Sequence, residues 1–598
     1  MGTRIACAVT MTLVGWALMA AGPGQAQERP FKPVTNAMLD NPDPADWLMM
    51  NRTHDEQRFS PLDQINTRNV GKLTLAWSRG LPGGAPQEST PIVHDGVMYL
   101  LTPGGFVQAL NAVDGEMIWE YAPDYPRRSG SSSWHGKSLA IYQDMVYFAA
   151  PGGELTALDA ITGKVRWKAK VDTGGGGPGG AGAGGVVVAD GKVISNRSCE
   201  PTLTRADCFI AAHDAITGKE VWKFYTAAGV NEPGGETWSP EIPDEKRLAS
   251  PWGLPGSYDP VRKVLYWGVA NPMPYTLLKR YGTTDRPKVT PSDLYSNSTV
   301  ALDVETGKLR WYYQELPSDD WDLDHNQERI LVRTKISPDP KHVKWISAAL
   351  KPGQVKDVVV TVAEGGSLFV VERESGQFLW AMPFPYDRPD VHIKGVDPVT
   401  GKVMVNSDLN FLKDGDKRLV CFHNTRSWWS TAYSPQTNSL YVPFHNACLQ
   451  MTADQTGTQG HRDRYAVITP GWDAKKYMQL AKVDMTTGKM EILFSQPQPS
   501  NGAALTTAGG LLFNGDLNRH LRAFDARSGK ILWDQRLGGM VISSTITYAV
   551  DGRQYVMVFT GEGMSGTTAP LKLAEANMPT PVRGHHAVYV FALPQDAR

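Results

Sequence analysis

Short apolar runs recur along the whole chain and predict β-strands rather than helices. The segments 96–101, 144–149 and 192–195 are examples, and each is bounded by residues that favour turns. The chain also contains 59 glycines and 18 tryptophans, which favours turn-rich β structure. The pattern therefore predicts an all-β protein built from many short strands.

One turn motif repeats between these runs and ends in a tryptophan at a fixed distance. Its consensus is A-x-D-x-x-T-G-K, followed by two or three residues and Trp. Asp or Thr opens such a hairpin turn and Gly supplies the positive φ. We expect each tryptophan to pack against the next unit. The turns are 109–116 with Trp119, 157–164 with Trp167, 214–219 with Trp222, 303–308 with Trp311, 372–376 with Trp380, 484–489 without a tryptophan, and 525–530 with Trp533.

The repeat predicts sheets of about four strands, whose open edges a closed ring would cover. Seven turns, a first β stretch ending at Trp77 and a last one at 587–593 favour an eight-bladed β-propeller, with seven blades as the alternative. The two end stretches could pair and close the ring. Separate β-sandwiches would explain neither the periodic tryptophan nor the lack of linkers.

Composition and the N-terminus restrict the class of protein. The chain is 41% hydrophobic and 20% charged with a formal net charge of -1, so nucleic acid and anionic membrane surfaces are not expected partners. The charged and apolar pattern of residues 1–26 predicts a signal peptide for export to the periplasm. The alternative is a permanent N-terminal anchor. Residues 27–598 would then be one propeller domain, and no later segment is apolar enough to span a bilayer.

Four cysteines remain once the signal peptide, with Cys7, is removed. Proximity in sequence indicates the disulfides Cys199–Cys208 and Cys421–Cys448. The sequence contains no C-x-x-C-H, which excludes covalent haem, and no cysteine spacing typical of a zinc site.

The acidic stretch 318–329, S-D-D-W-D-L-D-H-N-Q-E-R, is the strongest candidate for chemistry. In extended chain, Asp322 and Asp324 would project to one side. Two adjacent carboxylates require protonation or a cation, so we expect a metal ion with a general base beside it. The remaining acids, Asp319, Asp320 and Glu328, are expected to be loop charges, and His325 a hydrogen-bonded wall residue.

Four long insertions interrupt the repeat, and connections of this length commonly form caps or substrate walls. They are 225–248, 277–294, 387–419 and 451–479. The glycine-rich run 174–185 lacks the residues of a phosphate loop and is expected to be tightly packed backbone or a rim.

The tryptophan repeat, W-D-L-D at 321–324, Tyr258-Asp259-Pro260 and W-G-V-A-N-P at 267–272 together resemble the quinoprotein alcohol dehydrogenases. These periplasmic enzymes use pyrroloquinoline quinone (PQQ). The resemblance covers essentially the whole mature chain. It implies an eight-bladed propeller with PQQ and a metal ion in the central funnel, and oxidation of an alcohol to an aldehyde or ketone. Because this chain carries no haem, electrons would pass to a separate cytochrome c.

The resemblance also assigns roles to single residues. Asp322 corresponds to the catalytic base, and the metal ligands would be Glu200, Asn271, Asp322 and Asp324. The residues that would contact PQQ are Glu88, Lys137, Trp252 and Trp428. Calcium is the default metal. Asp324 corresponds to the carboxylate of lanthanide-using members and so favours a lanthanide. If Asp324 turns to solvent or pairs with Arg329, calcium suffices.

The chain departs from the family at three places. Ser131 and Ser132 replace a pair of adjacent cysteines, Ser427 replaces a PQQ-contacting Asn, and Glu364 stands where an Arg or Lys lies near the quinone oxygens. The missing cysteines and the insertions point to an open funnel for secondary, bulky or polymeric alcohols. The alternative function is a non-catalytic propeller scaffold of the outer-membrane assembly type, which would have no use for Asp322, Asn271 and Trp252.

Overall fold

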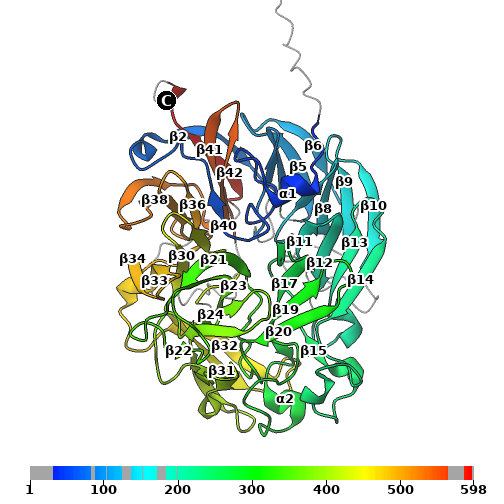
Figure 1. Ribbon diagram of the computed structural model, residues 1–598. Coiled ribbons are helices and arrows are strands. Elements are labelled where there is room, and N and C mark those ends of the chain that lie inside the picture. Colours follow the sequence, from blue (N-terminus) through cyan, green and yellow to red (C-terminus); the bar gives the residue numbers. More distant parts are fainter. Residues whose placement is uncertain are drawn as a thin grey trace, which may run out of the picture.

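The computed structural model describes residues 31–82, 88–102, 104–123, 136–150, 153–171, 183–197, 199–423, 425–562 and 585–595. The predicted signal peptide, Ser131, Ser132 and nearly all of the glycine-rich run lie outside these ranges. Over the described residues the regular structure is almost entirely β, as the hydrophobic pattern predicts. The sheets follow one another around a ring (Figure 1).

The part of the chain that is described contains eight sheets of four or five strands. The first four are β3 (Ile92–His94), β4 (Val97–Thr102), β5 (Phe106–Asn111) and β6 (Met117–Tyr121); β7 (Ala140–Tyr142), β8 (Met145–Ala150), β9 (Glu154–Asp159) and β10 (Val165–Lys170); β11 (Ala183–Ala189), β12 (Lys192–Arg197), β13 (Phe209–Asp214) and β14 (Glu220–Tyr225); and β16 (Ser257–Asp259), β17 (Val264–Val269), β19 (Ser298–Asp303) and β20 (Leu309–Gln314).

The remaining four of these sheets include the C-terminal strands. They are β21 (Ile330–Ile336), β23 (Gln354–Ala363), β24 (Gly366–Glu372), β25 (Phe378–Met382) and β22 (Trp345–Ile346); β29 (Ala432–Ser434), β30 (Ser439–His445), β33 (Met478–Asp484) and β34 (Met490–Gln496); β1 (Phe59–Ser60), β36 (Leu505–Thr507), β37 (Leu511–Gly515), β38 (His520–Asp525) and β39 (Ile531–Arg536); and β2 (Thr74–Gly80), β42 (Ala587–Ala592), β41 (Arg553–Thr560), β40 (Val541–Val550) and β35 (Asn501–Gly502).

The first and last β stretches pair, as predicted. Strand β2 runs antiparallel to β42, with Thr74 opposite Ala592 and Gly80 opposite Ala587. A strand from the N-terminal part of the chain thus completes the sheet formed by the C-terminal strands. This pairing joins the two ends of the chain in one sheet, in which β2 is an edge strand.

The repeated turns have the predicted geometry. In the turn at Asp214, the carboxylate accepts hydrogen bonds from the backbone N–H and hydroxyl of Thr217, both at 2.8 Å, and Gly218 has a φ of 72°. Asp397 forms the same turn within an insertion, between β26 and β27, and was missed by the sequence count. The motif therefore specifies a hairpin, whether or not that hairpin belongs to one of the large sheets.

At five positions the indole N–H of a tryptophan donates to a carbonyl in the turn of the following repeat. The Trp167 ring covers Gly218, where a Cβ atom would lie 2.6 Å from it, and its indole N–H donates to Ala215 O at 3.1 Å. The equivalent indole donors and carbonyl acceptors are Trp77 and Ala112, Trp119 and Ala160, Trp222 and Val304, and Trp311 and Arg373. Trp119 and Trp77 also belong to two of the apolar clusters of the core.

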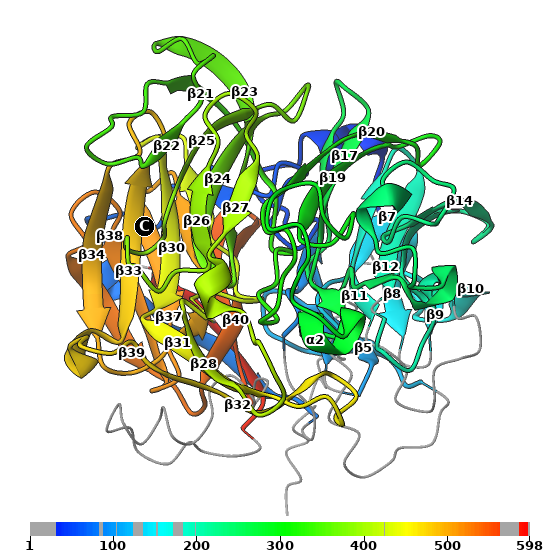
Figure 2. The ribbon, with the colours of Figure 1, turned by 90° about the horizontal axis from the view of Figure 1, so that it is seen from below.

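The insertions form smaller elements beside the ring. They are α2 (Leu277–Tyr281), the pairs β15 (Leu248–Ala249) with β18 (Pro272–Met273) and β26 (Ile393–Val396) with β27 (Val403–Val405), and the sheet of β28 (Lys417–Cys421), β31 (Ala447–Ala453) and β32 (His461–Ile468). Figure 2 shows α2 and β32 at the same end of the molecule. The helix α1 (Asn36–Asp40) and the one-turn helices η1 (Val70–Lys72), η2 (Arg205–Asp207), η3 (Gly235–Thr237), η4 (Asp244–Lys246), η5 (Ser407–Leu409) and η6 (Ala474–Lys476) complete the elements.

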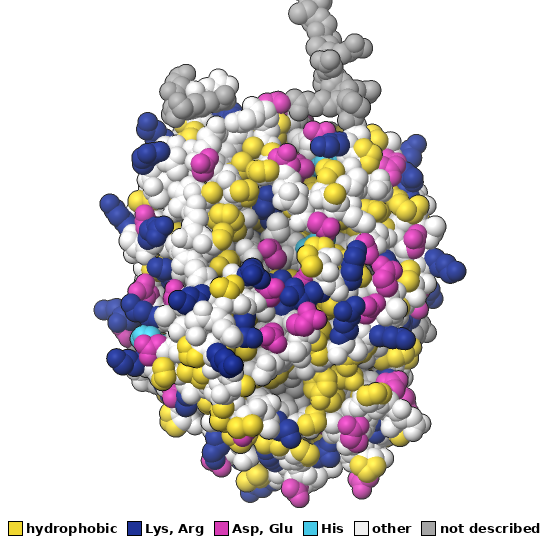
Figure 3. Space-filling model, in the orientation of Figure 1, with side chains coloured by type: hydrophobic (Ala, Val, Ile, Leu, Met, Phe, Trp, Pro, Cys, Tyr) yellow, Lys and Arg dark blue, Asp and Glu magenta, His cyan; other side chains and the backbone are white. Residues whose placement is uncertain are grey.

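Acidic and basic side chains are interspersed over the face shown in Figure 3. Among the described residues, no helix has both the length and the apolar character needed to cross a membrane.

Candidate active site

The acidic stretch follows β20 into the protein interior, so the prediction that three of its acids are solvated loop charges is wrong. Asp319, Asp320 and Glu328 are fully buried. Each carboxylate accepts hydrogen bonds from chain segments that would otherwise leave N–H groups unpaired. The donors are the amides of Trp321 and Leu323 for Asp319, those of Leu277 and Phe411 for Asp320, and Thr431 with Arg426 for Glu328.

Asp322 has a φ of 62° and does not lie in extended chain, so the predicted alternation with Asp324 is wrong. The two carboxyls still influence each other. Burial raises the pKa of Asp322 well above its usual range; Arg464 opposes this shift and Asp324 adds to it. The Arg464 Nη2 atom lies 2.7 Å from Asp322 Oδ2. The left-handed backbone of Asp322 directs its carboxyl to the Arg464 guanidinium. Asp322 is buried, and 8% of its surface remains exposed.

Asp324 is fixed by neighbours from two other segments. Its Oδ2 accepts the indole N–H of Trp252 at 2.7 Å, and its Oδ1 accepts the backbone N–H of Asn271 at 3.4 Å. Burial raises the pKa of Asp324 to about 6, although these donors favour its ionised form. Arg329 does not pair with Asp324 and instead donates to backbone oxygens of Gln327 and His325. Trp252, Asn271 and Asp324 therefore meet in the structure.

Asn271 presents a free amide to this site. The residue is 1% exposed and follows β17 in the chain. Within the described residues, neither its Oδ1 nor its Nδ2 has a hydrogen-bond partner. A buried amide without partners is unfavourable unless a ligand satisfies it. This arrangement fits a metal ligand.

Glu364 adds a third carboxyl. Its backbone N–H donates to Asp324 O at 3.0 Å, and burial, with the charges of Asp324 and Asp322, raises its pKa well above the usual range. His423 Nδ1 lies 3.8 Å from Glu364 Oε1. The acid at position 364 is thus part of the site, and a cation must come from elsewhere in the chain.

That cation is Arg464 of β32, which sequence reasoning missed. It is supplied by the insertion 451–479, and it lies 142 positions after Asp322 in the sequence. Nothing in the local pattern H-R-D-R at 461–464 distinguishes an inward-facing arginine from a solvated one. Only the tertiary fold brings this strand to the acidic stretch.

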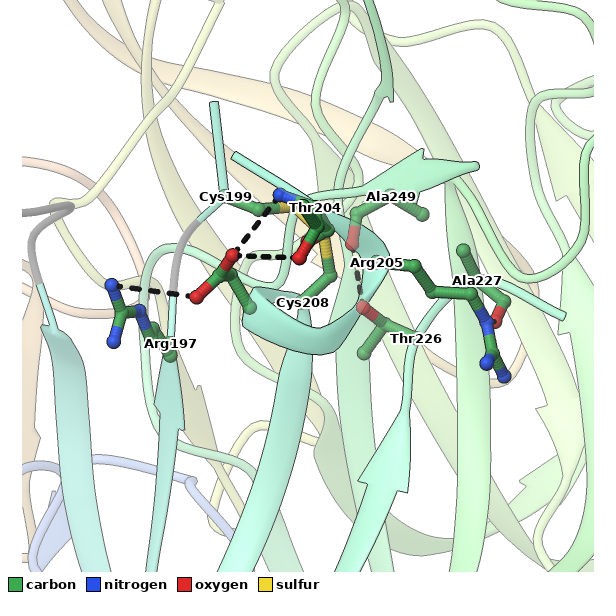
Figure 4. Close-up of a disulfide and its surroundings, with 9 residues drawn as sticks. Arg197, Cys199, Thr204, Arg205, Cys208, Thr226, Ala227 and Ala249 are labelled. Carbon is green, nitrogen blue, oxygen red and sulfur yellow. Dashed lines mark hydrogen bonds and ion pairs between the residues drawn. A yellow bond between two sulfur atoms is a disulfide. The ribbon is translucent and has the colours of Figure 1, made fainter. Parts of the chain in front are cut away.

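Glu200 lies in a loop that the predicted disulfide closes. Cys199 and Cys208 are joined, as are Cys421 and Cys448. Figure 4 shows this disulfide with Thr204 and Arg197 near it. Asp207 anchors the loop: its carboxylate accepts a hydrogen bond from the Thr204 amide and pairs with the Arg197 guanidinium. Glu200 Oε2 accepts from Gln459 Nε2 at 2.8 Å, and burial raises the pKa of Glu200. The charge of Glu200 contributes to the raised pKa of Asp322, which places the two acids in one electrostatic site.

Lys137 brings together the residues predicted to bind the cofactor. Its ammonium forms an ion pair with Glu88, and both side chains are almost fully buried. The Nζ atom lies 5.6 Å from the Trp252 ring centroid and 5.3 Å from that of Trp428. The four predicted residues are therefore neighbours, and they present one cation and two indoles.

The comparisons with known proteins identify the class of protein. The family model described as glucose/ethanol/alcohol dehydrogenase, beta-propeller domain, under the name PQQ, matches residues 47–386 and 472–556. The chain therefore belongs to the PQQ-dependent alcohol dehydrogenases. The protein is therefore classed as an enzyme, a PQQ-dependent alcohol dehydrogenase. The alternative function, a non-catalytic scaffold, is not supported.

Curated relatives and solved structures agree with this class. The chain is 30% identical to the quinohemoprotein alcohol dehydrogenase ADH-IIG of Pseudomonas putida, covering 88% of this chain and 74% of that protein. It is 28% identical to a lupanine 17-hydroxylase [cytochrome c] of Pseudomonas sp., over 92% and 76% of the two chains. Among structures, a europium-containing methanol dehydrogenase matches with a TM-score of 0.78 and 26% identity, over 93% and 100%.

The site residues fit PQQ and a hard cation. No three His, Cys, Asp or Glu side chains among the described residues are close enough to hold a metal ion by themselves. A cation at Asp322 and Asp324 would also need oxygens such as the unpartnered Asn271 amide. A cation beside Asp322, Asp324 and Glu364 would favour the ionised forms of these carboxyls, whose pKa values are raised without it. Lys137 near two indoles suits a planar anion.

Proposed function

We propose that the enzyme oxidises an alcohol to an aldehyde or ketone, with Asp322 as the general base. The observation that carries this proposal is the ion pair between Asp322 and Arg464, 2.7 Å long, beside two further buried carboxyls and the free amide of Asn271. Perturbed carboxyls with a specific charge partner are typical of catalytic sites.

Asp322 takes the proton from the substrate hydroxyl. Burial alone would keep this carboxyl protonated, and the guanidinium of Arg464 opposes that effect. A base of this kind typically contributes about 10²–10⁴-fold to the rate. When bound, PQQ would take up the two electrons of the alcohol as a hydride from its carbon, and the metal ion would supply Lewis acidity.

The proposed metal ligands are Glu200, Asn271, Asp322 and Asp324. Because the three acids are not close enough to one another to hold an ion as they lie, metal binding would have to draw their side chains together. Calcium or a lanthanide ion suits these oxygen donors. The likeness to a europium-containing methanol dehydrogenase supports the lanthanide. Trp252 and Trp428 would flank the PQQ plane, and Lys137, paired with Glu88, would meet its carboxylates.

The electrons would pass to a cytochrome c, and the enzyme would act in the periplasm after removal of residues 1–26. The name of the relative lupanine 17-hydroxylase [cytochrome c] and the apolar N-terminal pattern support these two steps. The substrate would be a secondary, bulky or polymeric alcohol. We also propose eight blades with docking tryptophans, which the eight large sheets and the five indole hydrogen bonds support.

The test is to add PQQ with Ca²⁺ or La³⁺ to purified apoprotein and follow dye reduction with a panel of primary and secondary alcohols. We expect reduction that requires PQQ, a metal and an alcohol together. If neither metal supports both PQQ binding and dye reduction, the proposal is wrong.

A further inference from the structure

Strand β32 and Gln459, two residues before it, carry polar atoms that are shielded from solvent but have no partner among the described residues. They are Gln459 Oε1, both ring nitrogens of His461, and Arg464 Nε. None of these atoms has a hydrogen-bond partner anywhere in the described ranges of the chain. Because shielded polar atoms are normally satisfied, such a group of three neighbouring residues indicates a place where a ligand supplies the missing partners.

A β-bulge turns these side chains toward the active site. Arg462 pairs with Thr452 and Tyr465 with Gln450, so two residues of β32 stand opposite Met451 alone. The first of them, Asp463, has a φ of 50°. In a regular strand, residues three apart face opposite sides. The extra residue places His461 and Arg464 on one side, whereas Arg462 and Asp463 are 56% and 60% exposed.

The group lies next to the proposed base. The His461 ring stacks on Tyr275, with centroids 5.1 Å apart and planes inclined by 8°. Burial raises the pKa of the Tyr275 hydroxyl, and Asp322 and Glu200 raise it further, so this ring lies close to both acids. The Tyr275 amide also donates to Gln459 O at 3.0 Å, which ties the insertion to the segment before α2.

The unpartnered atoms are suited to hydroxyl groups rather than to anions. The charge of Arg464 is matched by Asp322. Burial and the nearby Arg464 lower the pKa of His461 to about 4, so at neutral pH its ring offers one donor and one acceptor. Gln459 Oε1 adds an acceptor and Arg464 Nε a donor. A hydroxyl both donates and accepts, whereas a carboxylate only accepts.

We infer that Gln459, His461 and Arg464 form a subsite for further hydroxyl groups of the substrate, and that the enzyme prefers polyhydroxylated alcohols to simple alkanols. This inference rests on the proposed function and names its substrate class. A site built to hydrogen-bond a hydroxyl strongly rejects an analogue that lacks it, because its own polar groups then remain unpaired. The three residues lie outside the acidic stretch. Gln459 and His461 would bind hydroxyls other than the reacting one, and Arg464 would do so through Nε while its Nη2 pairs with Asp322.

The test compares sorbitol with 1-hexanol, two alcohols with the same number of carbons, using enzyme reconstituted with PQQ and the active metal. We expect kcat/KM for sorbitol to exceed that for 1-hexanol, and His461→Phe to lower their ratio by about ten-fold or more. His461→Phe preserves ring stacking on Tyr275. His461→Asn, which restores a donor and an acceptor, should recover part of the ratio, and Arg462→Ala, at an exposed neighbour, should leave it unchanged.

A second readout does not depend on turnover. Saturation-transfer NMR of sorbitol with the cofactor-free wild type should show binding that His461→Phe weakens and Arg462→Ala retains. The inference is overturned if wild type prefers 1-hexanol, or if His461→Phe lowers both kcat/KM values equally and leaves sorbitol binding intact. Absence of oxidation of every alcohol would instead contradict the proposed function.

Discussion

Arg464 lies against Asp322, with Nη2 2.7 Å from Oδ2, and joins an inserted strand to the acidic stretch after β20. This contact explains how a chain with an acid at position 364 still places a cation beside its base. Burial and the neighbouring carboxyls favour the protonated form of Asp322, and Arg464 favours the ionised form. The ion pair therefore controls the pH at which the base can work.

Replacing Arg464 should shift the pH dependence of the reaction. In Arg464→Met, the pKa of Asp322 rises further, so the base ionises only at higher pH. We expect the acidic limb of the kcat/KM profile to move to higher pH, and kcat/KM at pH 7 to fall roughly ten- to a hundred-fold. Arg464→Lys should restore part of the activity and of the profile. An unchanged acidic limb in Arg464→Met would show that the guanidinium does not tune this base.

Asp324 should influence the choice of metal. It adds a carboxylate to the site, and a trivalent ion gains more from this charge than a divalent ion. We expect Asp324→Ala to lose most La³⁺-supported turnover while retaining Ca²⁺-supported turnover, measured by dye reduction across a titration of each metal. Equal activity of wild type and Asp324→Ala with both metals would contradict this role.

The hairpins and the disulfides could be predicted because their sequence signals are local. The tryptophan and glycine of each turn are a few residues apart, and both cysteine pairs are near in sequence, so the hairpins and disulfides were predicted correctly. Burial is not local. The sequence of 318–329 does not reveal that Asp320 satisfies the amides of Leu277 and Phe411 from two insertions, nor that Arg464 reaches Asp322.

The buried ion pair of Glu328 and Arg426 should be important for stability. Burial opposes ionisation of Glu328, but Arg426 and the Thr431 donors outweigh it and lower its pKa. Arg426→Met would leave an uncompensated buried charge and should lower the free energy of unfolding in urea by about 3–5 kcal/mol. The double variant Glu328→Gln/Arg426→Met should recover much of this loss.

The same pair gives a pH test with a defined sign. A carboxyl whose folded pKa is lowered stabilises the protein above its unfolded pKa, and this contribution is lost as pH falls through the folded pKa. Wild type should therefore lose more stability in acid than the double variant does. Equal stability of Arg426→Met and the double variant at pH 7 would contradict the proposed pairing.

Gly218 should tolerate no side chain because the Trp167 ring covers it. Gly218 and Gly552 have nearly equal φ values, 72° and 73°, but a Cβ at Gly552 would meet no atom within 4 Å. Both alanine variants carry the strain of a positive φ, about 1 kcal/mol. Gly218→Ala should lose a further 1–3 kcal/mol or so from overpacking, measured by urea unfolding. Equal losses in the two variants would mean that the tryptophan contact contributes nothing.

The most direct test of the account is Asp322→Asn, with PQQ binding and turnover measured on the same samples. Asparagine keeps an oxygen for the metal but cannot accept the substrate proton. We expect the variant to bind PQQ, seen in the absorption spectrum, with wild-type stoichiometry, and its kcat for the best alcohol to fall by about 10²–10⁴-fold. A variant that binds PQQ and keeps more than roughly a tenth of wild-type kcat would show that Asp322 is not the base.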